Sequence, residues 1–283
     1  MTPLFAFLLL NSVSQQDPLG KFDLKDAERI MRSVIDRNHR LDAFDEGYGE
    51  VAIAKPEVFK VGAGSALIQL NFCIGAFDTF TGETANITME GDFEAKRKIL
   101  LSEGISTEVA EASLREILDL AGFKHPVKIM ECKRQSASRY RIFAIPDVGK
   151  RDLSPAFIIQ CELYAQRGQL DRIWLPRVPK TDHAEDAVLG EDELTDKAWA
   201  AYQAAEPYEK GYIAEKRLVL EVPKYGTPHN LTADYAPLVK DWQVIPVWRV
   251  LIFKEEDRGK AGVWDMQIVH VDARNGRVLK VDR

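Results

Sequence analysis

Several features of well-known protein classes are missing from this sequence. Its apolar runs all fall short of the roughly 18 residues that a membrane-crossing helix requires. The motifs GxGxxG, GxxxxGK(S/T), HExxH and GxSxG do not occur, so motifs predict no phosphate loop, zinc-protease helix or nucleophile elbow. An excess of positive charge is missing too, because 38 Lys and Arg stand against 44 Asp and Glu, for a formal net charge of -6. A general nucleic-acid-binding role needs a basic face and is therefore not expected.

Cysteine is scarce, with Cys73, Cys132 and Cys161 alone in the chain. No two of them form a CxxC pair, which excludes a zinc ribbon or a thioredoxin-like site on spacing. Each lies in an apolar or alternating run, where a thiol usually behaves as a small buried hydrophobe, so we expect no catalytic cysteine. An odd number of cysteines leaves at least one thiol unpaired. A disulfide between Cys132 and Cys161 remains an alternative if their strands are neighbours.

The composition that is present describes a folded chain, with 46% hydrophobic and 29% charged residues. At the amino end, the apolar run 4–10 is followed by the small residues Ser12 and Ser14. This pattern predicts a signal peptide over residues 1–14, cleaved after Ser14, and hence a secreted, periplasmic or envelope protein. No Lys or Arg precedes the run, so a frayed terminus or the first strand of a cytosolic domain remains the alternative.

Self-comparison of the chain indicates an internal repeat. Apolar residues at helical spacing predict helices at 24–37, 107–121 and about 193–205, with Asp23, Ser106 and Asp192 as amino-terminal caps. A further helical piece is expected at about 93–102. Strands are expected after each helix, at 51–59, 66–77, 127–134, 139–145, 157–164, 173–175, 212–222, 244–254, 263–271 and 278–281. Each series ends in a strand, a turn that contains one glycine (Gly82, Gly168 or Gly276) and a last short strand.

The final turn carries the most specific motif. The chain reads Pro246-x-Trp248-x-Val250 in one strand, and its closing hairpin reads Val-Asp-Ala-Arg-Asn-Gly-Arg-Val-Leu over 271–279. This segment resembles the PepSY domain family over about 40 residues. The likeness is weaker at 157–175, where Ala165 stands in place of the turn aspartate, and looser still at 67–87.

The resemblance implies small α+β units, each an antiparallel sheet packed on an amphipathic helix. With it we predict repeats at 15–92, 93–180 and 192–283, with an acidic linker at 181–191. Pattern alone supports this architecture, because each helix has one apolar stripe that can cover one sheet face. The family occurs in propeptides of secreted metallopeptidases and in envelope proteins, which implies export and a role in binding or restraining partners. No catalytic residues come with it.

No residues form a convincing metal, cofactor or catalytic site. Asp182, His183, Glu185 and Asp186 could collect a calcium ion, but they lack EF-hand spacing and are better explained as a solvated linker. His270 lies between two valines of a predicted strand, so we expect it on the surface.

Aromatic residues are the candidate partner-binding group. They are concentrated near the loop 223–237 of the third repeat: Trp242, Trp248, Trp264, Tyr225 and Tyr235. Such residues could line a groove for a peptide or a sugar, while the alternative is that the tryptophans fill a small core.

The sequence therefore predicts a non-catalytic exported protein that binds a protein or peptide partner, not nucleic acid. Two alternatives remain. One is an enzyme with a pocket on a cystatin-like curved sheet, and the other is a purely structural envelope component.

Overall fold

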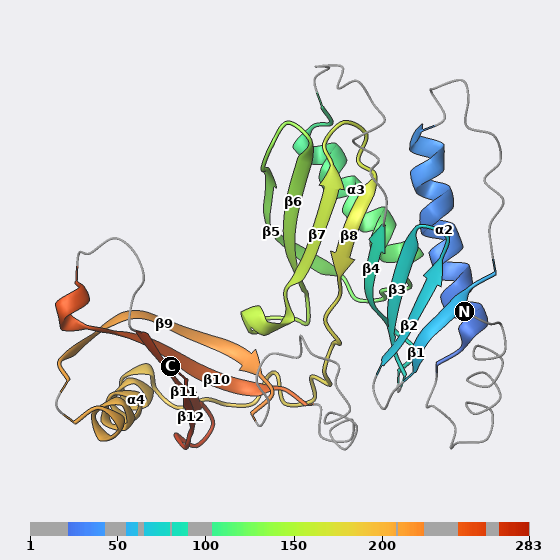
Figure 1. The fold of residues 1–283 in the computed structure, drawn as a ribbon. Coiled ribbons are helices and arrows are strands. Elements are labelled where there is room, and N and C mark those ends of the chain that lie inside the picture. The colour runs from blue at the N-terminus through green and yellow to red at the C-terminus, as the bar shows by residue number, and fades with distance from the viewer. Residues whose placement is uncertain are drawn as a thin grey trace. The chain divides into compact units, whose positions relative to one another are not determined.

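The computed structural model describes residues 22–42, 55–61, 65–79, 81–89, 104–207, 209–223, 243–258 and 266–282. Within these ranges the chain has three α-helices and two antiparallel sheets (Figure 1). The predicted α+β class is confirmed. The expected signal peptide (1–14) and the expected helix at 93–102 lie outside the described residues. None of the described helices is long and apolar enough to cross a membrane.

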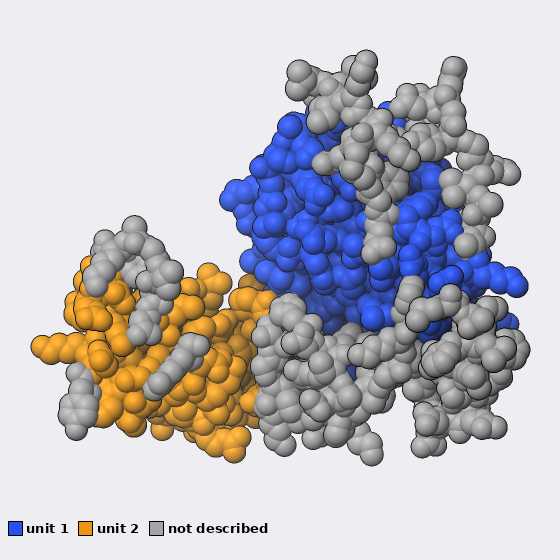
Figure 2. Space-filling model, viewed as in Figure 1, with its two compact units in different colours: residues 1–146, 157–177, 228–240 blue, residues 147–156, 178–227, 241–283 orange. Residues whose placement is uncertain are grey.

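The chain divides into two compact units, which Figure 2 colours separately. Unit 1 comprises residues 1–146, 157–177 and 228–240, and unit 2 comprises residues 147–156, 178–227 and 241–283. Each unit has its own buried apolar cluster, so each is described by itself.

Unit 1 contains an eight-stranded sheet in the order β1-β2-β3-β4-β8-β7-β6-β5. Its strands are β1 (Glu57–Val61), β2 (Ser65–Leu70), β3 (Cys73–Asp78), β4 (Thr84–Met89), β5 (Val127–Arg134), β6 (Arg139–Pro146), β7 (Ile159–Tyr164) and β8 (Leu170–Trp174). The order shows two consecutive four-stranded meanders, β1–β4 and β5–β8. They are joined edge to edge where β4 pairs with β8, with Ile87 opposite Ile173.

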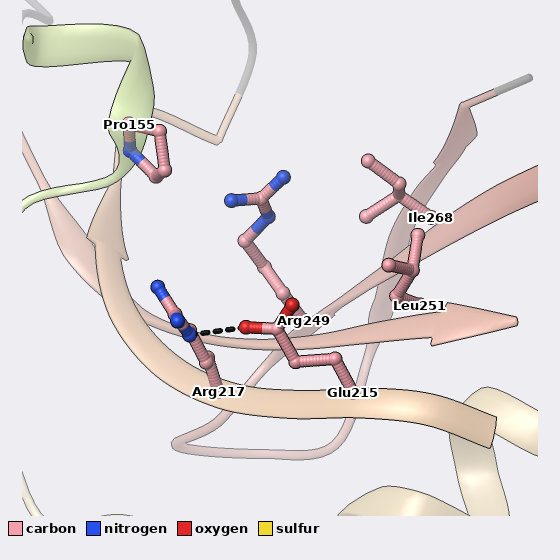
Figure 3. Close-up of a pocket in the computed structure, with 6 residues that line it drawn as sticks. All are labelled: Pro155, Glu215, Arg217, Arg249, Leu251 and Ile268. Atoms are coloured by element: carbon pink, nitrogen blue, oxygen red, sulfur yellow. Dashed lines mark ion pairs between the residues drawn. The ribbon is translucent and has the colours of Figure 1, made fainter.

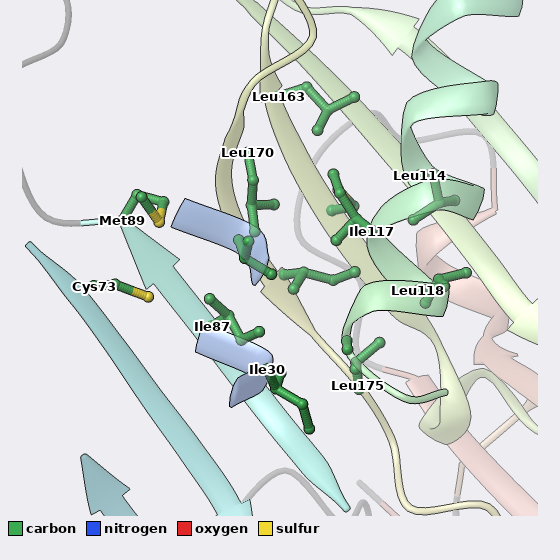
Figure 4. Close-up of a cluster of buried hydrophobic side chains, with 14 of the residues drawn as sticks. Ile30, Cys73, Ile87, Met89, Leu114, Ile117, Leu118, Leu163, Leu170 and Leu175 are labelled. Atoms are coloured by element: carbon green, nitrogen blue, oxygen red, sulfur yellow. The ribbon is translucent and has the colours of Figure 1, made fainter. Parts of the chain in front are cut away.

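Two helices, α2 (Leu24–Asp42) and α3 (Thr107–Leu120), cover one face of this sheet (Figure 1). The expected caps are confirmed: Asp23 accepts from the backbone N–H of Lys25 at 2.9 Å, and Ser106 accepts from that of Val109 at 3.4 Å. Apolar side chains of both helices and of the strands interlock in one cluster (Figure 4). Its members include Ile30, Met31, Ile35, Ile87, Leu114, Ile117, Leu118, Leu163, Leu170 and Ile173.

The end of α2 is also fastened to the second meander by polar contacts. The Asn38 side chain donates to the carbonyl of Leu170 and accepts from its N–H, both at 2.9 Å. The buried Arg37 guanidinium donates to the Gly168 carbonyl at 3.0 Å and to Glu116 of α3 at 2.6 Å. The helix of the first meander is thereby tied to the last hairpin of the second.

Unit 2 contains a four-stranded sheet in the order β12-β11-β10-β9, and α4 (Glu191–Ala205) covers one face. The strands are β9 (Gly211–Glu221), β10 (Ile245–Lys254), β11 (Met266–Asp272) and β12 (Val278–Asp282). A short 3₁₀ turn occurs at Glu255–Asp257, and another at Pro155–Phe157, whose last residue belongs to unit 1. Asp192 does not cap α4 as predicted. The helix begins at Glu191, two residues before the predicted start, so the cap position falls on Gly190. Asp192 lies in the first turn, where a negative charge interacts favourably with the helix dipole.

The three glycine turns have the same hydrogen bonds. In the first, the Gly82 N–H donates to the Asp78 carbonyl and the Asp78 N–H donates to the Glu83 carbonyl, both at 2.8 Å. The same two bonds recur at Tyr164, Gly168 and Gln169, and again at Asp272, Gly276 and Arg277. All three glycines have a positive φ, between 71° and 75°. One helix followed by a four-stranded meander thus occurs three times among the described residues, and the first two copies share one eight-stranded sheet. The three repeats and their boundaries stay a prediction.

The cysteines are all unpaired. Cys132 on β5 and Cys161 on β7 both face Ile142 of β6, so one strand separates them and no disulfide between them can form. Burial raises the pKa of the Cys73 thiol to about 12 and, together with the charges of Glu111 and Glu108, that of Cys132 to about 11. Both thiols therefore stay protonated near neutral pH.

Candidate functional site

A small pocket lies on the sheet face of unit 2 that α4 does not cover, called here the helix-free face. It has a volume of about 200 Å³ and is lined by Pro155, Glu215, Arg217, Arg249, Leu251 and Ile268 (Figure 3). That volume is below the roughly 300–1,000 Å³ of sites that hold drug-sized ligands. The pocket is therefore sized for one or two side chains.

Strand alternation explains why these residues meet. Trp248, Val250 and Ile252 of β10 point into the core beneath α4, so Arg249 and Leu251 between them point the other way. The register then brings their partners alongside: Arg249 pairs with Arg217 of β9, and Leu251 pairs with Glu215 of β9 and Ile268 of β11. The outcome is a pair of guanidinium groups next to an aliphatic wall.

The two arginines are directly opposite each other across neighbouring strands, an arrangement that ordinarily destabilises a sheet. Each has a carboxylate partner that reduces the repulsion. Glu215 pairs with Arg217, and the Glu221 Oε1 atom lies 3.2 Å from the Arg249 Nε atom. The Arg217 side chain is 64% exposed and the Arg249 side chain 21% exposed, so Arg249 is the more enclosed of the two. Its guanidinium rises between Pro155 and the Leu251–Ile268 wall (Figure 3).

Behind Arg249 lies a buried acid–imidazole group. The His270 Nδ1 atom is 2.7 Å from Glu221 Oε2, and its Nε2 atom is 3.1 Å from Asp282 Oδ2. Burial acts to raise the pKa of the Glu221 carboxyl. The hydrogen bond with His270 and the nearby positive charges lower that pKa by more than burial raises it, so the pKa lies below its usual range. Glu221 therefore stays ionised and holds Arg249 in place.

This group is poorly arranged for proton transfer to a ligand. The His270 side chain is 3% exposed and both of its ring nitrogens face carboxylates. The six pocket-lining residues include no hydroxyl or thiol nucleophile. What the pocket offers is hydrogen-bond donation from guanidinium groups beside apolar surface, which suits binding of a carboxylate next to an aliphatic group.

An equivalent position in unit 1 has a related arrangement. His270 lies two residues before the turn residue Asp272, and its strand neighbours are Arg249 and Lys280. In unit 1, Glu162 lies two residues before the turn residue Tyr164, and its strand neighbours are Arg141 and Arg172. Two cationic residues therefore flank a buried polar residue on the helix-free face of both sheets.

Sequence reasoning placed the site elsewhere. Trp248 is 8% exposed and packs in the core beneath α4, whereas Trp242, Trp264, Tyr225 and Tyr235 lie outside the described residues. His270 does face away from the core as predicted, but the expectation of a surface histidine is wrong, because Glu221 and Asp282 enclose it. The alternation of apolar and polar residues in β10 and β11 could have indicated that Arg249 and Ile268 lie on one face of the sheet. The strand register that brings Arg217 of β9 beside Arg249 could not be predicted from the sequence.

The acidic segment considered for calcium makes protein contacts instead. Asp186 Oδ2 lies 3.0 Å from His183 Nδ1 and 3.3 Å from Arg274 Nη1, and Arg151 donates to the carbonyl of Ala184 at 2.6 Å. Among the residues that the structure describes, no group of three His, Cys, Asp or Glu side chains could hold a metal ion.

Comparison with known proteins gives little further guidance. No protein-family model and no curated protein matches the chain. Among solved structures, the chain is similar to the Bacillus megaterium YpeB C-terminal domain, with 11% sequence identity and a TM-score of 0.42 over 93% of this chain and 98% of that one. A likeness at that level carries no conclusion about function.

Proposed function

We propose that this chain is a non-catalytic binding protein built from PepSY-like repeats, and that the unit 2 pocket holds a carboxylate-bearing residue of a protein or peptide partner. The observation that carries the proposal is the Arg217–Arg249 pair beside Leu251 and Ile268. Glu215 and Glu221 offset part of the repulsion between these two like charges, and an anion seated between the guanidinium groups would offset more of it. The small volume favours a single residue, such as the carboxyl terminus of a peptide that ends in an aliphatic side chain.

A pair of peptides tests this proposal. One is acetyl-GSVL with a free carboxyl terminus, and the other is the same peptide with a terminal amide. We expect the free acid to bind at least about tenfold more tightly by isothermal titration calorimetry, since a hydrogen bond to a charged group contributes about 1.5–3 kcal/mol. Arg249→Gln should weaken binding of the acid by a similar factor.

Arg277→Gln is the matched control, because Arg277 is an exposed residue of the β11–β12 turn in the same unit. It should leave the affinity unchanged. Equal binding of the acid and the amide, or equal losses from the Arg249 and Arg277 variants, would contradict the proposal.

The proposal also includes export, which rests on the apolar run 4–10 and the small residues after it. Amino-terminal sequencing of the protein from its source cell checks this part separately. A mature chain that starts near Gln15 supports export, and an intact Met1 in the cytosolic fraction refutes it.

A further inference from the structure

Three arginines surround one glutamate on the helix-free face of unit 1. Arg139 and Arg141 project from β6 and Arg172 from β8, while Glu162 lies on β7 between them. The Glu162 Oε2 atom is 2.9 Å from Arg172 Nη2 and 3.4 Å from Arg139 Nη1, and Oε1 is 3.3 Å from Arg141 Nη2. One carboxylate thus gathers three guanidinium groups. We call these four residues the arginine platform.

The charges of the platform are layered. The carboxylates lie underneath: the Glu162 side chain is 3% exposed and that of Asp171, which lies 2.6 Å from Arg139, is 11% exposed. The guanidinium side chains of Arg139, Arg141 and Arg172 are 34–39% exposed. Since three cations stand over two anions, the outer layer is positive. This arrangement attracts an anion while the buried acids hold the cations in place.

The guanidinium groups are also held in orientation by aromatic rings. Arg172 lies 4.9 Å from the ring centre of Trp174, Arg139 5.6 Å from that of Tyr164, and Arg141 6.0 Å from that of Phe143. Side chains fixed in this way lose less conformational freedom when they bind a ligand.

The platform keeps donors for a ligand. Arg172 donates only Nε and Nη2 to Glu162, which leaves its Nη1 group without a partner among the described residues. Arg139 contacts Glu162 and Asp171 through Nη1, and Arg141 contacts Glu162 through Nη2. A guanidinium has five N–H groups in a planar fork, so each arginine can bind a second carboxylate.

The geometry points to a docking surface for an extended acidic segment of a protein partner. Arg139 and Arg141 are two residues apart in one strand, which separates them by about 6.6–6.8 Å. Alternate side chains of an extended peptide have the same separation, so carboxylates at positions i and i+2 match the two arginines. Single-stranded nucleic acid fits less well, because the guanidinium groups already occupy ring faces on which bases would stack.

Binding of an alternating acidic peptide to the full chain tests the inference. The probe is fluorescein-labelled acetyl-SEVEVES-amide, and its matched control replaces each glutamate with glutamine. We expect the glutamate peptide to bind at least about tenfold more tightly in fluorescence anisotropy, with an affinity that falls as salt rises. Arg141→Gln should lower the affinity about tenfold, and Arg141→Lys, which keeps the charge but loses the planar fork, should lower it less.

Two control variants make the result specific. Arg115→Gln removes an exposed arginine of α3 on the other side of the sheet, and Arg277→Gln removes an exposed turn arginine of unit 2; neither should change the affinity. Equal binding of the two peptides to the wild-type chain overturns the inference, whatever the stability of the variants. A loss with Arg115→Gln as large as with Arg141→Gln also overturns it, as does tighter binding of an oligothymidylate. A loss only with Arg249→Gln overturns it while leaving the proposed function intact.

Discussion

At the residue scale, Glu221 in unit 2 and Glu162 in unit 1 have the same structural role. Each is an almost buried carboxylate that holds arginines on a helix-free face. Burial acts to raise the pKa of both carboxyl groups, but hydrogen bonds and nearby positive charges outweigh it, so both pKa values are low. No local pattern indicated this role, because a glutamate inside a strand normally marks a solvent-facing position. The arginines that compensate its burial come from other strands.

The stability supplied by Glu221 should depend on pH. Its folded-state pKa is below the unfolded value, so its contribution is complete above the ordinary carboxyl range of about 4–5 and is lost as pH falls through the folded-state pKa. We expect Glu221→Gln to destabilise unit 2 by about 1.5–3 kcal/mol at pH 7 and by clearly less near pH 3. Urea unfolding of both proteins across this range measures the difference.

Asp196→Asn serves as the control for that experiment, because Asp196 is an exposed acid on α4 in the same unit. Its effect should be small at every pH. A Glu221→Gln effect that stays constant from pH 7 to pH 3 would show that the charge of Glu221 does not stabilise the fold.

At the element scale, the helices and turns were largely predictable, and the sheet partners were not. Local signals set the start of α3 at Ser106 and the three glycine turns, since caps and positive φ values depend on neighbouring residues only. The pairing of β4 with β8 joins residues that are far apart in sequence, so no local pattern indicated it. The arginine platform and the pocket depend on the exact register of consecutive strands, which β-bulges shift after Glu162 and after Leu251. No local pattern indicated those shifts, which is why both sites were missed.

The glycine turns carry a prediction at this scale. Gly168 has φ +71°, and a Cβ atom there would lie 2.8 Å from Ser113 Oγ on α3. Gly168→Ala should therefore destabilise unit 1 by about 1–3 kcal/mol, from backbone strain and from the contact with the helix. The double variant Gly168→Ala with Ser113→Ala removes the contact and keeps the strain, so it should recover part of the loss. Thermal unfolding that is unchanged by Gly168→Ala would contradict the close packing of turn on helix.

At the scale of the whole molecule, the two apolar clusters share no residue. A cavity in one cluster should therefore weaken its own unit selectively. Ile117 of α3 is fully buried, and Ile117→Ala is expected to destabilise unit 1 by about 2–5 kcal/mol. Hydrogen exchange should show faster exchange in β6 and β7, with β10 and β11 unaffected.

Val109→Ala is the control on the same helix, because Val109 is 48% exposed and its truncation should change stability by less than about 0.5 kcal/mol. Equal acceleration of exchange in both units after Ile117→Ala would mean that the chain unfolds as one cooperative body.

The join between β4 and β8 has a consequence for how the protein is made. As the chain leaves the ribosome, β4 emerges well before β8, the strand that will pair with it. Until Ile173 and its neighbours are synthesised, the nascent first meander presents an uncovered strand edge, the kind of surface that recruits strands from other chains. Translation that pauses or stops between these two strands would therefore release a fragment prone to aggregate, whereas completion of β8 seals that edge within the same molecule.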